Sequence, residues 1–99
     1  MNMNEKNIFD ISKKTIIITG AAGLLGSEYA KGLSKQGANV VLVDLDIKRC
    51  KEISSELNKK YAVESLAIKL DITKISSIKN MVKIIMKKYN KIDVLINNA

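Results

Sequence analysis

The feature that most constrains this chain is a glycine pattern at the junction of two different segments. Residues 15–19 form an apolar, β-branched run, and residues 24–36 form an amphipathic segment. Between them, Gly20 permits a tight turn and Gly23 lets the backbone approach a ligand without a Cβ atom. Gly26 lets the helix pack closely on the strand. The unpaired amides of the first helical turn and the helix dipole then predict a phosphate site, with a dinucleotide as the expected ligand.

Strand-like and helix-like segments alternate along the rest of the chain, with short connections and no proline. We expect strands over residues 39–43, 63–70 and 92–96, and helices over residues 47–61 and 74–89. The predicted fold is an α/β, doubly wound, Rossmann-like parallel sheet with right-handed crossovers and helices on both faces. In that arrangement the strands lie in the order 3-2-1-4, and a ligand binds at their carboxyl ends.

Apolar side chains at helical spacing predict the face that each helix buries. Asp46 is the predicted N-cap of the second helix, because a carboxylate there accepts from the free amides of the first turn. The residues expected on the buried faces are Leu25, Tyr29 and Leu33 in the first helix, Ile47, Cys50, Ile53, Leu57 and Tyr61 in the second, and Ile75, Ile78, Val82, Ile85 and Tyr89 in the third.

Length and composition indicate one domain, or part of one. The 99 residues are 46% apolar, and no apolar run reaches the roughly 18 residues that a membrane span needs. Residues 1–13 hold few apolar anchors, so we expect a tail there and a partial dinucleotide-binding domain over residues 14–99. Because the polar start is not followed by a signal-peptide core, we expect a cytoplasmic protein without membrane contact.

Charge and cysteine content argue against several kinds of site. The formal net charge is +7, but the lysines are spread along the chain and only 4% of residues are aromatic, so nucleic-acid binding is not expected. Cys50 is the only cysteine and there is no histidine, which rules out an internal disulfide and argues against a structural zinc site. We expect no metal, and we predict that Cys50 is a buried, inert thiol.

An acidic residue follows the second predicted strand at the distance that ribose recognition needs. Asp44 lies 24 residues after Gly20, near the usual spacing of about 20. A carboxylate there accepts from both ribose hydroxyls and repels a 2′-phosphate. No Arg or Lys lies between Gly20 and Gly26 or at position 45, so NAD is expected in preference to NADP. The alternative is that Asp44 only begins a loop, as Asp46 is expected only to cap a helix.

Several segments together resemble the amino-terminal half of a short-chain dehydrogenase/reductase. They are the glycine pattern of residues 19–26, Val43-Asp44, Asp71-Ile72-Thr73 and residues 93–99, and the resemblance covers nearly the whole chain. It implies that the pyrophosphate and the neighbouring ribose are held by Gly20, Gly23, Leu25 and Gly26. It also implies that Asp44 holds the adenosine ribose, and that Asp71 and the backbone of Ile72 contact the adenine. Finally, it implies that Asn98 and Ala99 line the cofactor and brace the sheet.

The glycine spacing departs from the short branch of that family, which spaces its glycines unevenly. Here the spacing is even, which resembles the extended branch of sugar-nucleotide epimerases and dehydratases. The ending Asn97-Asn98-Ala99 is similar to the short branch, and that similarity extends back through the preceding strand. We therefore interpret the chain as a member of the short branch, with Asn97 as a structural amide beside the strand end.

The resemblance also implies where the chemistry lies. In this family a tyrosine acts as general acid or base, and a lysine four residues later lowers the pKa of that tyrosine. Tyr29, Tyr61 and Tyr89 are not followed by a lysine at that distance. We therefore expect no catalytic residue in this chain, which is predicted to be a cofactor-binding half truncated before the remaining strands of the sheet.

The function implied for the complete protein is NAD-dependent hydride transfer between nicotinamide and an alcohol or carbonyl substrate. The glycine spacing suggests a sugar-derived small molecule, and the complete protein is expected to be a homo-oligomer. Two alternatives stay open: a non-catalytic dinucleotide-binding or interaction module, and a fragment of an extended-branch epimerase or dehydratase. With a sheet edge unpaired, the isolated 99 residues are expected to be marginally stable and to associate.

Overall fold

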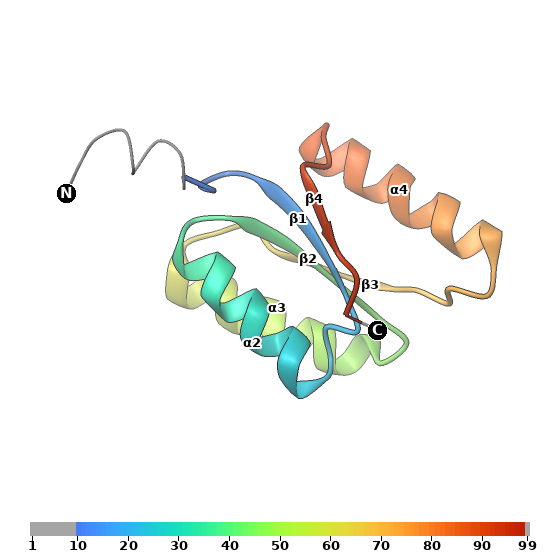
Figure 1. The fold of residues 1–99 in the computed structure, drawn as a ribbon, viewed down its shortest axis with the longest axis horizontal. Coiled ribbons are helices and arrows are strands. Elements are labelled where there is room, and N and C mark those ends of the chain that lie inside the picture. Colours follow the sequence, from blue (N-terminus) through green and yellow to red (C-terminus); the bar gives the residue numbers. More distant parts are fainter. Residues whose placement is uncertain (1–9, 99) are drawn as a thin grey trace.

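The computed structural model describes residues 10–98, in which strands and helices alternate along the chain (Figure 1). Its elements are β1 (Thr15–Thr19), α2 (Leu24–Lys35), β2 (Asn39–Asp44), α3 (Ile47–Tyr61), β3 (Leu66–Lys69), α4 (Ile75–Tyr89) and β4 (Val94–Ile96). The strands form one sheet in the order β3-β2-β1-β4, and every neighbouring pair is parallel. The predicted doubly wound sheet and its strand order are confirmed.

Helices cover both faces of the sheet. Figure 1 shows α2 and α3 on one side of the strands and α4 on the other. Ile16 and Ile18 of β1 pack with α2 and α3, whereas Ile17, between them in the strand, packs with α4. Because successive strand residues point to opposite faces, both sides of β1 are buried. This explains why the isoleucines of residues 16–18 form a continuous apolar run rather than an alternating one.

The buried face of α2 differs from the predicted one. We expected Leu25, Tyr29 and Leu33 to face the core, but the side chains of Leu25 and Tyr29 are exposed and only Leu33 packs against it. The buried residues are small ones offset by one position: Gly26, Ala30 and Ser34. The start of α2 lies so close to the end of β1 that even a Cβ atom on Gly26 would be 2.4 Å from the Gly20 carbonyl oxygen, so no large side chain fits there.

The face of α4 was also predicted only in part. Ile85 is fully buried and Met81 nearly so, and Tyr89 packs beside them, but Ile75, Ile78 and Val82 are exposed. The apolar pattern of α4 is wider than the line along which the helix meets the sheet. In contrast, α3 buries Cys50, Ile53 and Leu57 as predicted, with its terminal Ile47 and Tyr61 half-buried.

Two strands are shorter than predicted. β3 begins at Leu66 rather than Val63, because the amides of Glu64 and Ser65 donate to the side chains of Asn39 and Asn58 instead of to a strand. β4 begins at Val94. In the segment before β1, Ile11 packs against the core, as predicted for the tail, whereas the other two expected anchors, Ile8 and Phe9, lie outside the described residues.

Among residues 10–98, no helix has both the length and the apolar character that crossing a membrane requires.

Candidate functional site

The glycine loop between β1 and α2 has the geometry that its sequence predicts at two positions. Gly20 has φ +63°, which L side chains rarely adopt. A Cβ atom on Gly26 would lie 2.4 Å from the carbonyl oxygen of Gly20, so this position tolerates no side chain. A Cβ on Gly23 would make only an ordinary contact, at 3.4 Å from the same oxygen. The packing of the chain therefore requires Gly20 and Gly26, whereas a requirement for Gly23 stays a prediction about a ligand.

The first turn of α2 presents amides without partners in the helix. Gly23 is the N-cap residue, no side chain caps the turn, and the turn carries no acidic residue. The first bond of the helix runs from the Ser27 N–H to the Gly23 carbonyl, at 3.0 Å. The amides of Leu24, Leu25 and Gly26 therefore have no intrahelical acceptor. Together with the positive end of the helix dipole, they form a surface that attracts an anion.

Asp44 ends β2 beside the glycine loop. Its Oδ2 accepts a hydrogen bond from the Ala22 N–H at 3.1 Å, and its Oδ1 accepts one from the Asp46 N–H at 3.0 Å. The carboxylate thus lies between the loop and the start of α3. It does more than begin a loop, because it directly contacts the segment that carries the phosphate-facing amides.

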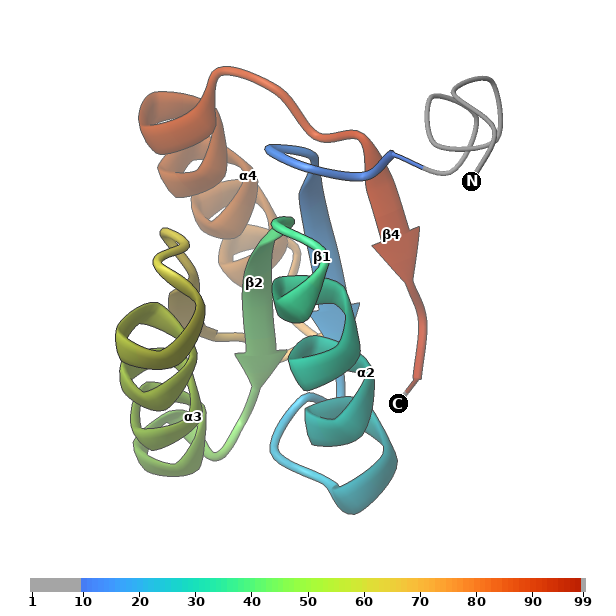
Figure 2. The same ribbon diagram turned by 90° about the vertical axis from the view of Figure 1, so that its left-hand side faces the viewer.

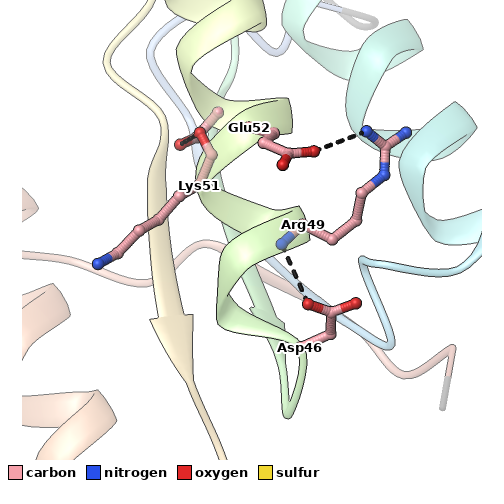
Figure 3. A network of polar contacts seen from close by, with 5 residues as sticks. Asp46, Arg49, Lys51 and Glu52 are labelled. Atoms are coloured by element: carbon pink, nitrogen blue, oxygen red, sulfur yellow. Dashed lines mark hydrogen bonds and ion pairs between the residues drawn. The ribbon is translucent and has the colours of Figure 1, made fainter.

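The start of α3 carries the predicted cap. Asp46 Oδ1 accepts from the Arg49 N–H at 3.1 Å, and the Arg49 guanidinium contacts Glu52 at 3.5 Å, while Lys51 points away from both contacts (Figure 3). Behind this turn, Cys50 is fully buried. Burial, followed by the charges of Asp44 and Asp46, raises the pKa of Cys50 to about 11. The prediction of a buried thiol is confirmed, and the high pKa makes that thiol unreactive at neutral pH.

Asp71 follows β3 at the same edge of the sheet. Its Oδ1 accepts from both the backbone N–H and the hydroxyl of Thr73, at 3.0 and 2.6 Å. These bonds lower the pKa of Asp71, helped by the positive charges of Lys74 and Lys69. The Asp71 amide donates to Ser77 Oγ at 3.0 Å, which attaches the turn to α4. Asp71 is therefore held as an anion in a fixed turn.

A pocket of about 200 Å³ lies at the carboxyl ends of β1, β2 and β3. It brings together four of the predicted site residues, including both carboxylates, and no Lys or Arg of residues 10–98 lines it. Apart from these carboxylates and two threonines, its walls are apolar, so it offers apolar contact to a ring and acceptors to hydroxyl or amino groups. The lining residues are Thr19, Gly20, Val43, Asp44, Leu45, Leu70, Asp71, Ile72 and Thr73.

The segment after β4 is attached to the end of β1 through Thr19. The Thr19 hydroxyl donates to Asn97 Oδ1 and accepts from the Asn98 N–H, both at 3.0 Å. Asn98 Nδ2 also donates to the Gly20 carbonyl oxygen at 3.4 Å. Asn97 thus has a structural contact, although its partner is a hydroxyl rather than the predicted backbone. Asn98 braces the glycine loop, and Ala99 lies outside the described residues.

Three contributors to this site were not assigned a role from the sequence: Thr19, Ala22 and Thr73. The Asp71-x-Thr73 spacing is typical of a turn closed by an aspartate side chain, so that signal was present. The part played by the Ala22 N–H depends on how a loop and a distant strand end meet, and no local pattern reveals it. No tyrosine of the described residues is paired with a lysine as the family's chemistry requires, and Tyr89 donates its hydroxyl to the Glu64 carbonyl.

Comparisons with known proteins agree with this arrangement. A short-chain dehydrogenase of Gibberella zeae is 39% identical over all of this chain and 36% of its own length. The NAD-dependent glycerol dehydrogenase of Listeria innocua is 38% identical over 92% of this chain and 34% of its own. L-Sorbose reductase from Gluconobacter frateurii, solved with NADPH and L-sorbose, matches with a TM-score of 0.84 and 30% identity over 92% of this chain and 35% of its own.

The chain thus spans about a third of the length of the two curated relatives named above. The family model that describes short chain dehydrogenases matches residues 14–99, the whole extent of the sheet and its helices. With the glycine loop, the parallel sheet in the order β3-β2-β1-β4 and the acidic residues at its carboxyl edge, this match identifies the chain as a member of the short-chain dehydrogenase family.

Proposed function

We propose that this chain is the cofactor-binding part of an NAD-dependent oxidoreductase that interconverts an alcohol and a carbonyl compound. The observation that carries the proposal is the pocket in which Asp44, Asp71 and Gly20 meet, next to the unpaired amides of α2. A dinucleotide has an adenine and ribose for the pocket and a pyrophosphate for the amides. When bound, NAD supplies the hydride acceptor or donor of the reaction.

In this proposal, the predicted site residues contribute to binding in the following ways. The amides of Leu24, Leu25 and Gly26 are positioned to bind pyrophosphate oxygens, and Gly23 leaves room for them. Asp44 would accept from the hydroxyls of the adenosine ribose. Asp71 and the exposed Ile72 would lie along the adenine. Asn98, held by Thr19, would keep the loop in place beside the cofactor, with Ala99 next to it in sequence.

The preference for NAD rests on charge. In the described part of the chain, two carboxylates and no cation line the pocket, so the additional phosphate of NADP would meet negative charge. The glycerol dehydrogenase relative is named as NAD-dependent, whereas the sorbose reductase was solved with NADPH. Family membership is therefore compatible with either cofactor, and Asp44 is the residue on which the choice depends here.

The substrate class that we propose is a polyhydroxy alcohol or the corresponding sugar. Glycerol and L-sorbose, named for the two relatives above, are both of this class. The short-chain family match, rather than an extended-branch one, makes direct alcohol or carbonyl chemistry the proposed reaction. We propose a homo-oligomer for the complete protein, with catalysis by residues beyond the matched third of the relatives.

Calorimetric titration with NAD and NADP tests the cofactor assignment. We expect NAD to bind more tightly, and we expect Asp44→Ala to weaken NAD by at least about tenfold, since it removes charge-assisted hydrogen bonds to the ribose. Asp10→Ala, which removes a carboxylate before β1, is the control and should leave NAD affinity unchanged. Tighter binding of NADP, or unchanged NAD affinity in Asp44→Ala, would contradict the proposal.

A second candidate function applies to the 99 residues by themselves. They contain no tyrosine followed four residues later by lysine, which favours a dinucleotide-binding module without catalysis. Binding of NAD without turnover of glycerol or sorbose by this chain would support the module. The coding sequence and the intact mass of the native protein then distinguish a module made at this length from part of a longer enzyme.

A further inference from the structure

Each oxygen of the Asp44 carboxylate accepts one backbone N–H. Oδ2 accepts from Ala22 in the glycine loop, and Oδ1 accepts from Asp46 at the start of α3, at 3.1 and 3.0 Å. One side chain therefore connects the end of β2, the loop after β1 and the next helix. A residue whose only task is to bind a ribose needs neither of these bonds.

The loop has few other attachments to β2. The Ala21 N–H donates to the Val43 carbonyl at 3.3 Å, and the Gly23 N–H donates back to Gly20 within the loop at 3.2 Å. The Ala22 amide, between them, is partly buried and has the Asp44 carboxylate as its acceptor. Without that acceptor, the amide would be left unpaired, and the loop would be free to turn away from β2.

We propose that Asp44 is a positioning residue for the glycine loop, which it holds through the Ala22 amide so that the first amides of α2 face the pyrophosphate. This role is additional to the ribose contact and rests on the proposed function. Its consequence is that the two ends of the adenosine diphosphate are recognised cooperatively, because one carboxylate serves both.

The chemistry of the carboxylate explains why aspartate is needed. Two amides approach the side chain, one at each terminal atom, so both atoms must be acceptors. An asparagine offers one oxygen and one NH₂ group, so in either orientation a donor would face a donor. A carboxylate oxygen has a second lone pair, which leaves each oxygen of Asp44 able to accept from a ribose hydroxyl as well.

A thermodynamic cycle separates the two roles. Affinities of the wild type and of Asp44→Ala are measured by calorimetry for NAD and for its analogue lacking both hydroxyls of the adenosine ribose. Alanine leaves no acceptor for the Ala22 amide. Asp46→Asn is the control for the lost charge, because it removes the same charge two residues away, and asparagine is an equally good helix cap. If Asp44 acted only through the ribose, Asp44→Ala would not change the affinity for the analogue.

We expect Asp44→Ala to weaken binding of the analogue about tenfold and binding of NAD by more, with Asp46→Asn within about twofold of the wild type. An unchanged affinity of Asp44→Ala for the analogue would overturn the positioning role while leaving the ribose contact intact. Failure of the wild type to bind NAD would instead overturn the proposed function.

Amide hydrogen exchange tests the loop contact without any ligand. In the wild type, the Ala22 amide should exchange at least about tenfold more slowly than an unprotected loop amide, because it is hydrogen-bonded. Asp44→Ala, which removes both acceptor atoms, should remove this protection, and Asp46→Asn should keep it. Fast exchange of Ala22 in the wild type would overturn the proposal even if Asp44→Ala does not fold.

Discussion

Helices α3 and α4 have the same length, 15 residues, yet they meet the sheet in different ways. α3 buries Cys50, Ile53, Ser54 and Leu57, whereas α4 buries only Met81 and Ile85. α3 has α2 and two strands as neighbours, but α4 is alone on its face of the described sheet (Figure 2). An amphipathic pattern therefore indicates that a helix has an apolar face, and the neighbouring elements decide how much of that face is covered.

The same contrast separates the two edges of β1. Toward β2, the strand ends in a loop held by Asp44 and covered by small residues of α2. Toward β4, it pairs with a strand in which Val94 and Leu95 are 43% and 60% exposed. The candidate site lies mainly on the well-packed side, and the region of β4 and α4 carries an apolar surface.

The largest effect is expected from a substitution that removes one of the two buried side chains of α4. Ile85→Ala removes a fully buried side chain and should lower the free energy of unfolding by about 3 to 4 kcal/mol. Ile84→Ala, one residue earlier and 37% exposed, is the matched control and should cost less than about 1 kcal/mol. Urea denaturation measures both, and equal losses would mean that α4 is seated differently.

The next effect concerns the close packing of α2. Gly26→Ala places a Cβ 2.4 Å from a backbone oxygen and should destabilise the chain by about 2 to 3 kcal/mol. Gly32→Ala, in the same helix with nothing within 4 Å, should instead stabilise it by about 1 kcal/mol. Thermal unfolding of the two variants compares them, and a neutral Gly26→Ala would contradict the described approach of α2 to β1.

A smaller effect, which depends on pH, tests the β4 edge. Asp93 Oδ2 accepts from the Thr15 N–H at 2.8 Å and from the Lys91 ammonium at 3.2 Å, and the Thr15 bond chiefly lowers the pKa of Asp93. A carboxyl whose pKa is lower in the folded state than in the unfolded state stabilises the folded state. This contribution is complete at pH values above the unfolded pKa of about 3.9. This contribution is lost as the pH falls through the folded pKa.

Asp93→Asn should therefore be less stable than the wild type at neutral pH, and the difference should shrink below about pH 4. Glu56→Gln, at an exposed position of α3, is the control and should show a smaller difference at every pH. Denaturant midpoints measured from pH 7 to 3 provide the comparison. A difference between Asp93→Asn and the wild type that does not change with pH would contradict the role of the carboxylate.

The smallest change in stability is expected at the exposed apolar surface of β4, where a substitution should instead change how strongly the chain associates. Leu95→Lys changes a side chain that is 60% exposed, so stability should change by about 0.5 kcal/mol or less. We expect the wild-type chain to be marginally stable and to associate, and the variant to associate less. Sedimentation velocity measures this, and a monodisperse wild type with a sharp cooperative melt would contradict the expectation.

The sequence predicts the topology well because alternating strands and helices with short connections allow only a few strand orders in a parallel sheet. The residues at or just after strand ends, Asp44, Asp71 and Asn98, come to one edge because parallel strands end together. The buried sides of α2 and α4 were predicted less well, since several adjacent lines of apolar side chains fit the helical period. Only the distance to the sheet selects Gly26 and Ala30 over Leu25 and Tyr29.

The hydrogen bond from Ala22 to Asp44 illustrates the other limit. Twenty-two positions separate the two residues, and nothing about an alanine indicates that its amide has a carboxylate partner. Polar contacts between loops arise from the packing of whole elements, so they follow from the fold rather than from local sequence. The roles of the site residues in binding a cofactor stay predictions until the titrations above are made.

The pairing of β1 with β4 has a consequence for how the chain folds. The bond between Thr15 and Asp93 spans 78 positions, and that between Thr19 and Asn98 spans 79. During synthesis, nearly all of these residues must therefore leave the ribosome before β1 can pair with β4 along its second edge. Closing such a long loop carries a large entropic cost, so we expect this pairing to form late, after the local β1-α2-β2 unit. Until then β1, whose three isoleucines are almost fully buried in the folded chain, has one unpaired edge.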